Sequence, residues 1–334
     1  MARKEVDVLV VGAGFCGLAI AIAAARRGLA VRCVGDGRPG ASLANFGQLH
    51  SGAVYAPVLP DVAQACWQYR DRWHDLAGPA RIGMPHGYAL FDSVDSVERY
   101  QAAWQRLSIT ATEIDPRIVG SALPAAAAFS IPDYSVHLPT LHHRLADLAR
   151  ASGVVTEHDQ PIYLPGDLTT TPATVVLATG AHTPVLLSAM GLAHDLRSRR
   201  IVWGQLPQGG GRDLTYWLDG DLLALSPDRE GIRAGLPSNA GQYGAADTER
   251  HRLQVALARR GLSTTDNSLR VLSSTVCEPA ETTVAPSTRV IDLRDPPTGW
   301  IRTNNLIVAL PGKWTTAWQC ADQVVEALTR SPAS

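Results

Sequence analysis

Three glycines near the amino terminus have the spacing of a phosphate-binding turn. Residues 12–17 read Gly-Ala-Gly-Phe-Cys-Gly. In this pattern Gly12 makes a tight bend, Gly14 lets the backbone approach a pyrophosphate, and Gly17 lets the next helix pack closely on the preceding strand. The N–H groups and partial positive charge at a helix N-terminus then bind the phosphates. The pattern therefore predicts that a dinucleotide binds here.

The segments around this turn have the order of a strand–helix–strand unit. Residues 6–11 are typical of a buried parallel strand, and residues 18–27 predict a helix that ends at a glycine. A second strand is expected at residues 30–34. An acidic residue usually ends that strand and binds the adenosine ribose, but Gly35 occupies the position here. We therefore expect the next residue, Asp36, to bind the ribose.

Further along the chain, strand-like and helix-like segments alternate. Strands are expected at residues 174–178 and 305–309, and residues 222–234 have the pattern of a hairpin. Amphipathic or apolar helices are expected at residues 61–76, 139–151 and 316–328.

The distribution of these segments predicts an α/β protein with two domains. A length of 334 residues is about twice that of an average domain. Residues 82–134 and 201–290 alternate in hydrophobicity and predict a mainly β domain that binds the substrate. The nucleotide-binding domain is expected to be Rossmann-like and discontinuous, and to comprise residues 1–81, 135–200 and 291–334.

Composition argues against several other classes of protein. The chain is 46% hydrophobic and 18% charged, with a formal net charge of -1, which predicts a folded protein without a nucleic-acid partner. The five cysteines are scattered and form no Cys-x-x-Cys pair, so we expect neither a disulfide framework nor a metal site. Apolar runs are too short for a membrane span or a signal peptide, so we expect a cytoplasmic location.

Four further segments follow the glycine turn in an order typical of one enzyme family. They are residues 41–52 (Ala-Ser-Leu-Ala-Asn-Phe-Gly-Gln-Leu-His-Ser-Gly), 175–181, 230–235 and 304–312. With the turn at residues 12–17, they resemble the FAD-dependent D-amino-acid-oxidase-like oxidoreductases, which include glycine and sarcosine oxidases and 2-hydroxyglutarate dehydrogenases. The resemblance implies FAD rather than NAD as the cofactor, and a Rossmann-like domain of the glutathione-reductase type.

The resemblance also implies the chemistry, which is hydride transfer to flavin N5 from a substrate C–H bond next to nitrogen or oxygen. The substrate would be a small amine, amino acid or 2-hydroxy acid, and oxygen or a carrier would accept the electrons. His50 lies in the loop expected beside the flavin and could accept a proton, with Ser51 as a further donor there. Lys313, one of only two lysines, would stabilise charge on the reduced flavin, and Arg233 is a candidate for substrate binding.

The residues expected to contact FAD lie in the glycine turn, after the second strand, in the loop of residues 41–52, and in two later turns. They are Gly12, Ala13, Gly14, Phe15, Cys16, Gly17, Asp36, Ser42, Asn45, Phe46, Gly47, Gln48, Ala178, Thr179, Gly180, Gly312, Lys313, Trp314 and Thr315.

One departure from the family leaves the function open. Relatives commonly hold a substrate carboxylate with an arginine just before the last strand, whereas residues 275–279 read Thr-Val-Cys-Glu-Pro, which argues against a simple amino acid. Further substrate-binding candidates are Arg302, Tyr216 and Tyr243. The alternative functions are a flavin-dependent monooxygenase and a non-catalytic flavin-binding protein.

Two other features have competing interpretations. Cys277 is either a buried inert thiol or, by similarity to sarcosine oxidases, a residue that links covalently to the flavin. His142 and His143 are adjacent on a helix, and we expect them on a solvent-exposed polar face rather than at a metal site.

Overall fold

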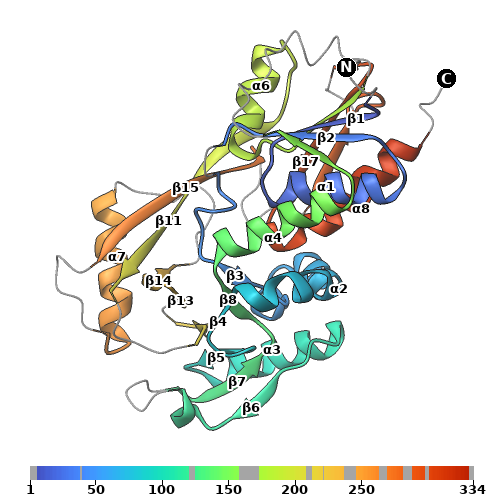
Figure 1. The fold of residues 1–334 in the computed structure, drawn as a ribbon. Coiled ribbons are helices and arrows are strands. Elements are labelled where there is room, and N and C mark those ends of the chain that lie inside the picture. Colours follow the sequence, from blue (N-terminus) through green and yellow to red (C-terminus); the bar gives the residue numbers. More distant parts are fainter. Residues whose placement is uncertain are drawn as a thin grey trace. The chain divides into compact units, whose positions relative to one another are not determined.

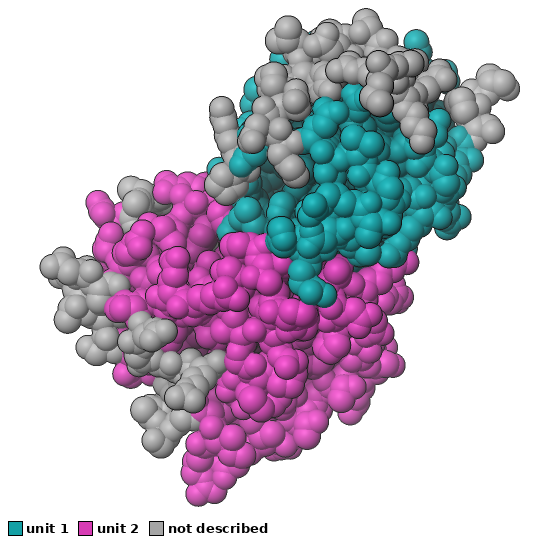
Figure 2. All heavy atoms as spheres, in the orientation of Figure 1, with its two compact units in different colours: residues 1–43, 142–199, 275–334 teal, residues 44–141, 200–274 magenta. Residues whose placement is uncertain are grey.

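The chain divides into two compact units, each described here by itself (Figure 2). Unit 1 comprises residues 1–43, 142–199 and 275–334, and unit 2 comprises residues 44–141 and 200–274. These boundaries differ from those expected, because residues 44–81 and 135–141 lie in unit 2 and residues 275–290 lie in unit 1. The computed structural model describes residues 6–37, 40–119, 125–157, 173–207, 213–220, 222–236, 246–262, 269–280, 288–297 and 301–330.

Unit 1 is built on a six-stranded sheet with the order β16-β17-β10-β1-β2-β9. Figure 1 labels β1, β2 and β17 of this sheet. All neighbours pair in parallel except β16 and β17, which are antiparallel. The strands expected around the glycine turn, and the two expected further along the chain, are confirmed. The bounds are β1 (Val8–Val11), β2 (Val31–Val34), β9 (Val155–Glu157), β10 (Thr174–Leu177), β16 (Arg289–Asp292) and β17 (Leu306–Leu310).

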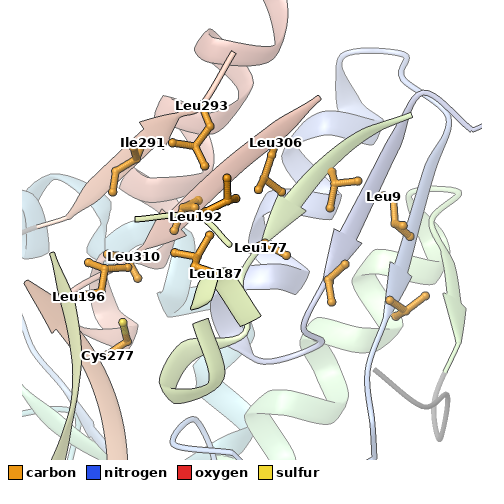
Figure 3. Close-up of a cluster of buried hydrophobic side chains, with 14 of the residues drawn as sticks. Leu9, Leu177, Leu187, Leu192, Leu196, Cys277, Ile291, Leu293, Leu306 and Leu310 are labelled. Carbon is orange, nitrogen blue, oxygen red and sulfur yellow. The ribbon is translucent and has the colours of Figure 1, made fainter. Parts of the chain in front are cut away.

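Helices cover both faces of this sheet. Helix α1 (Phe15–Arg26) packs against α8 (Ala317–Thr329) on the face to which Val10 points. The other face carries Leu9 and an apolar cluster that includes side chains from α6 (Thr183–Ala189), as Figure 3 shows. Because successive strand residues point to opposite faces, the continuous apolar run of β1 is buried on both sides.

Unit 2 is built on an eight-stranded sheet with the order β15-β11-β14-β13-β12-β5-β7-β6. The predicted hairpin is confirmed, with β13 and β14 antiparallel and Asp228 paired with Gly231. The chain passes from one unit to the other inside β11 and inside β15. The bounds are β5 (Gly87–Phe91), β6 (Thr112–Ile114), β7 (Ala127–Ile131), β11 (Leu196–Leu206), β12 (Thr215–Trp217), β13 (Leu223–Asp228), β14 (Gly231–Gly235) and β15 (Arg270–Pro279).

The expected second domain built on a sheet is confirmed, and two helices that were not expected lie within residues 82–134 and 201–290. Helix α3 (Val94–Leu107) and helix α7 (Ala246–Arg259) pack on opposite faces of the sheet. In α3 the buried side chains are Tyr100, Ala103 and Trp104, which have helical spacing, and the Ser93 hydroxyl caps the first turn by accepting from the N–H of Ser96. Strands lie before and after α3 in the chain, and the strand-like pattern of these neighbours hides the helical spacing of α3 in the sequence.

The remaining elements of unit 2 include a small three-stranded sheet with the order β3-β8-β4. The helix expected at residues 61–76 is confirmed as α2, and the one expected at residues 139–151 as α4, which begins in unit 2 and ends in unit 1. None of the helices in the described ranges is long and apolar enough to cross a membrane. The bounds are β3 (Gln48–Leu49), β4 (Arg81–Ile82), β8 (Tyr134–Val136), α2 (Pro60–Ala77) and α4 (Leu138–Ala151).

Candidate functional site

The glycine turn between β1 and α1 leaves no room for side chains. Gly12 has a φ of +113°, and a Cβ placed on it would lie 2.4 Å from the carbonyl oxygen of Ala178 at the end of β10. A Cβ on Gly17 would lie 1.7 Å from the carbonyl oxygen of Gly12. Glycine is therefore required at both positions, for the bend and for the close approach of α1 to the turn.

Gly14 has a different role, because its backbone is extended and compatible with any residue. A Cβ on Gly14 would lie 2.8 Å from the hydroxyl oxygen of Ser42, and that same oxygen accepts a hydrogen bond from the N–H of Phe15 at 3.1 Å. The first turn of α1 contains no acidic residue. Backbone N–H groups and a side-chain hydroxyl thus surround a space that a methyl group would fill, which fits the pyrophosphate of a dinucleotide.

The structure also explains why Gly35 stands where an acidic residue is usual. A Cβ on Gly35 would lie 2.8 Å from the Cβ of Ala13, so a side chain there would collide with the glycine turn. The N–H of Gly35 is held at 3.0 Å by the carbonyl oxygen of Glu157. Asp36 follows as the first acidic residue after β2, and its contact with the ribose stays a prediction.

His142 corrects the expectation of a solvent-exposed histidine pair. Its side chain is partly buried, and its Nε2–H donates to the carbonyl oxygen of Ala13 at 2.7 Å. The ring also meets the ring of Phe15 edge-on, with centroids 5.8 Å apart. His142 therefore fixes the glycine turn from α4, whereas His143 is 74% exposed and lies beside Asp147. The sequence carried no signal for this contact because the two residues are 129 positions apart in the chain.

The turn after β17 contacts the same region of unit 1. Gly312 has a φ of +73°, and the N–H of Lys313 donates to the carbonyl oxygen of Pro311 at 2.8 Å. The ring of Trp314 lies 5.1 Å from that of Phe15, centroid to centroid, and Thr315 is buried. Of the predicted cofactor-binding residues, those near Gly12, Ala178 and Gly312 are thus assembled in one unit.

The loop of residues 41–52 crosses from unit 1 to unit 2, and its second part is fixed to the large sheet. Asn45 accepts from the N–H of Gly47 through Oδ1 at 2.9 Å and from the guanidinium of Arg233 through its carbonyl oxygen. Arg233 also donates to Asp228 at 2.7 Å. The guanidinium predicted to bind substrate therefore holds the loop on β14, and a substrate contact through it stays a prediction.

One face of the large sheet beneath this loop carries buried donors. Phe46 lies over Gly235, where a Cβ would come within 1.9 Å of its ring, and its ring centroid is 5.9 Å from that of Trp203. The indole N–H of Trp203 and the side-chain amide nitrogen of Gln205 are buried on this sheet without a hydrogen-bond partner in the described part of the chain. The same holds for the amide nitrogen of Gln48, which lies in β3 of the small sheet. Unpaired buried donors are costly, so this face fits a ligand with acceptor oxygens.

His50 is the centre of a buried hydrogen-bond network in unit 2. Its Nδ1 lies 3.1 Å from Oδ2 of Asp133, and its Nε2 lies 2.9 Å from the hydroxyl of Tyr55. A carboxylate only accepts, so Nδ1 carries the proton and Nε2 accepts from Tyr55 in the neutral ring. The hydroxyl of Tyr216 lies 3.2 Å from the same carboxylate oxygen and 3.3 Å from Nδ1.

Asp133 organises this network. It is fully buried, and its Oδ1 accepts from the backbone N–H of Ser51 at 2.7 Å and from the hydroxyl of the same residue. Burial raises the pKa of Tyr55 and of Tyr216 well above the ordinary value, and the charge of Asp133 raises both further. Both phenols therefore stay neutral near neutral pH. Asp133 and Tyr55 were not predicted from the sequence.

The other candidates lie away from these two clusters. The Nε–H of Arg302 donates to the carbonyl oxygen of Arg294 at 2.7 Å on the surface of unit 1. Tyr243 lies outside the described residues.

Cys277 is buried in the apolar cluster of unit 1, where Figure 3 shows it near Leu196 and Leu310. Burial raises the pKa of its thiol to about 12, with further contributions from Glu278 and Asp195. This environment favours the interpretation as an inert thiol, because the thiolate is the reactive form.

We therefore expect Cys277 not to be linked to the flavin. Acid precipitation should release all flavin into the supernatant. Iodoacetamide should alkylate the native thiol slowly at about pH 8, and faster as the pH rises, because a raised pKa leaves little thiolate at neutral pH. Peptide mass spectrometry measures the alkylation, with the protein unfolded in guanidinium as the control. Flavin retained in the pellet would contradict this expectation.

The mainly parallel sheet with this glycine turn, beside a second unit built on a large sheet, defines an FAD-binding oxidoreductase with a Rossmann-like fold. The sequence model of the family described as FAD dependent oxidoreductase, DAO, matches residues 7–258, more than half of the chain. The chain belongs to this family, FAD is its cofactor, and the resemblance found in the sequence is confirmed.

Solved structures support the fold over the whole chain. Glycine oxidase from Geobacillus kaustophilus is 19% identical, with a TM-score of 0.71, over 99% of this chain and 96% of that one. Iminodiacetate oxidase (IdaA) from Chelativorans sp. BNC1 is 17% identical, with a TM-score of 0.71, over 98% and 96%. FAD-bound L-alpha-glycerophosphate oxidase from Mycoplasma pneumoniae is 17% identical, with a TM-score of 0.67, over 98% and 96%. No curated protein matches the chain in sequence.

Proposed function

We propose that this oxidoreductase oxidises a small amine, amino acid or 2-hydroxy acid, and that His50 accepts the proton released from the substrate nitrogen or oxygen. Bound FAD supplies the acceptor for a hydride from the substrate carbon. The observation that carries the proposal is the buried His50–Asp133 pair, because a carboxylate on Nδ1 leaves Nε2 as a base. The names of two similar structures, a glycine oxidase and an iminodiacetate oxidase, support the amine and amino acid part of this range.

The proton reaches His50 through Tyr55 in this proposal. The Tyr55 hydroxyl takes a proton from the substrate and gives its own proton to Nε2 of His50, 2.9 Å away. Asp133 stabilises the resulting imidazolium and keeps the ring oriented. Neither tyrosine has to ionise, which agrees with the raised pKa of Tyr55.

The cofactor contacts in this proposal are those expected from the sequence. The turn of Gly12 and Gly14 would hold the pyrophosphate, and the amide of Gln48, buried without a partner among the described residues, would donate to an acceptor oxygen of FAD or substrate. Lys313, ahead of the short helical turn Trp314–Thr316, would stabilise negative charge on the reduced flavin.

Two finer points belong to the same proposal. The electrons pass from the cofactor to oxygen or to a carrier, and no nucleic acid takes part, as the net charge of -1 suggests. The location is cytoplasmic, which agrees with five free cysteines in the structure, since disulfides are rare in reducing compartments.

The proposal is tested by anaerobic mixing of the holoenzyme with glycine, sarcosine, L-proline and 2-hydroxyglutarate while the flavin absorbance is recorded. We expect at least one compound to bleach the flavin, and His50→Gln to slow bleaching by about 100-fold. His86→Gln is the matched control, because His86 also contacts a tyrosine, Tyr88, at 3.3 Å but lies outside the network. NADPH consumption without bleaching by any compound would instead indicate a monooxygenase and contradict the proposal.

A further inference from the structure

A cavity of about 170 Å³ in unit 2 reaches the His50 network from the surface. Its wall includes His50 and Ser51 of the network, and also Arg70, Asp71, His74 and Tyr134. His74 is exposed, and the carboxylate of Asp71 is 81% exposed, so this end of the cavity meets solvent. A cavity of this volume, with polar side chains in its wall, has room for several water molecules, at ~30 Å³ each.

The network itself has few routes to water. Asp133 is fully buried, and Ser51 and Tyr216 are 1% and 4% exposed. A proton accepted by His50 can leave through a group that touches both the network and the cavity, and His50 itself and Ser51 are two groups that do so. Ser51 is such a group, because its hydroxyl donates to Oδ1 of Asp133 while the residue lines the cavity.

Further groups with suitable chemistry line the cavity. The hydroxyl of Tyr134 lies 3.2 Å from Nδ1 of His74, and the two rings meet edge-on. Burial raises the pKa of Tyr134 above its ordinary value, so its hydroxyl relays protons without ionising. His74 is exposed at the solvent end of the cavity, and its two ring nitrogens can accept and donate, so it can pass a proton on to bulk water.

We propose that this cavity is the proton port of the active site, and that Ser51 and His74 carry the proton released by substrate oxidation from the His50–Asp133 pair to bulk water. The inference rests on the proposed function. The imidazolium of His50 passes its Nδ1 proton to Asp133, and Ser51 takes that proton while it gives its own hydroxyl proton to a cavity water. His74 takes the proton from that water and releases it to solvent, and the His50 ring turns so that its remaining proton again faces Asp133. One proton leaves the substrate and one enters water, so the charges and atoms balance.

The first test compares flavin bleaching with proton release in the same stopped-flow experiment. The holoenzyme is mixed anaerobically, in weakly buffered phenol red solution, with sarcosine or whichever compound of the panel bleaches the flavin. In the native protein proton release should keep pace with bleaching. In Ser51→Ala and His74→Ala we expect proton release to lag about tenfold behind bleaching. Added imidazole should restore the rate in His74→Ala, because it can occupy the vacated space.

Matched control variants distinguish a loss of proton transfer from a general effect of removing a buried hydroxyl or a histidine. Ser226→Ala removes a buried hydroxyl of the same unit that lies 2.8 Å from the hydroxyl of Ser135 and does not line the cavity. His86→Ala removes a histidine that pairs with Tyr88 and does not line the cavity either. Both should release protons in step with bleaching. Unchanged coupling in Ser51→Ala and His74→Ala would overturn the proton port even where the proposed function holds.

A second measurement needs no substrate. The proton on Nδ1 of His50 should give a downfield proton resonance, and its exchange with deuterated water in the holoenzyme should slow about tenfold in Ser51→Ala. An unchanged exchange rate would overturn the port. If no compound bleaches the flavin, the proposed function fails while this exchange still tests the path from His50 to solvent.

Discussion

Replacement of Asp133 by asparagine is expected to slow flavin reduction by about 100-fold or more and to destabilise the protein by about 3 kcal/mol. Asparagine has nearly the same shape, but its NH₂ group would face donors. The carboxylate accepts from the N–H and hydroxyl of Ser51, from Nδ1 of His50 and from the hydroxyl of Tyr216, and an amide can satisfy only some of these. Without the charge, His50 also becomes a weaker base.

Two measurements separate these effects. Urea unfolding gives the free energy of unfolding, and anaerobic stopped-flow absorbance gives the rate of flavin reduction in the protein that is folded. Asp115→Asn is the control, because Asp115 is a surface carboxylate that pairs only locally, with Arg117. It should leave both quantities near the native values. A folded Asp133→Asn protein that reduces its flavin at the native rate would show that the network has no part in the chemistry.

Replacement of Gly14 by alanine is expected to weaken FAD binding on the order of 30-fold while the protein still folds. The backbone at Gly14 is extended, so alanine is not strained there. Its methyl group would lie 2.8 Å from the Ser42 hydroxyl and would occupy the space next to the N–H groups of α1. Overpacking at this point opposes the close approach of a pyrophosphate.

Gly40→Ala provides the matched control, because no described heavy atom lies within 4 Å of a Cβ at Gly40. The ratio of flavin to protein after purification and the dissociation constant from flavin fluorescence titration measure the difference. Far-ultraviolet circular dichroism confirms that both variants fold. Equal FAD affinity of the two variants would mean that the phosphates bind elsewhere.

The strand–helix–strand unit around the glycine turn could be predicted because its determinants are local. Gly12 and Gly17 are required by steric contacts between neighbouring elements, and such requirements leave a spacing in the sequence. The hairpin of β13 and β14 was visible for the same reason, since its turn and alternation are contiguous. Helix α3 was missed because its helical spacing lies among strands.

The candidate site could be predicted only in part. His50 was found from its loop, but Asp133 is 83 residues further along the chain and Tyr216 is 166 residues further, so the sheet pairing that brings them together leaves no local pattern. Arg233 was predicted to bind substrate, whereas the structure shows it bound to Asn45 and Asp228. A guanidinium can bind a substrate carboxylate or hold a loop in place, and the sequence does not show which partners it has in the folded protein.

The interleaving of the two units has a consequence for biosynthesis. The sheet of unit 1 joins β1 to β10 and β10 to β17, so the glycine turn gains its full support only after Leu310 has been synthesised, about 300 residues later. Ribosomes add about 5–20 residues per second, so the turn waits tens of seconds for its partners. The apoprotein thus completes its nucleotide site only after β17 has been made, and cofactor insertion follows the synthesis of that strand rather than guiding it.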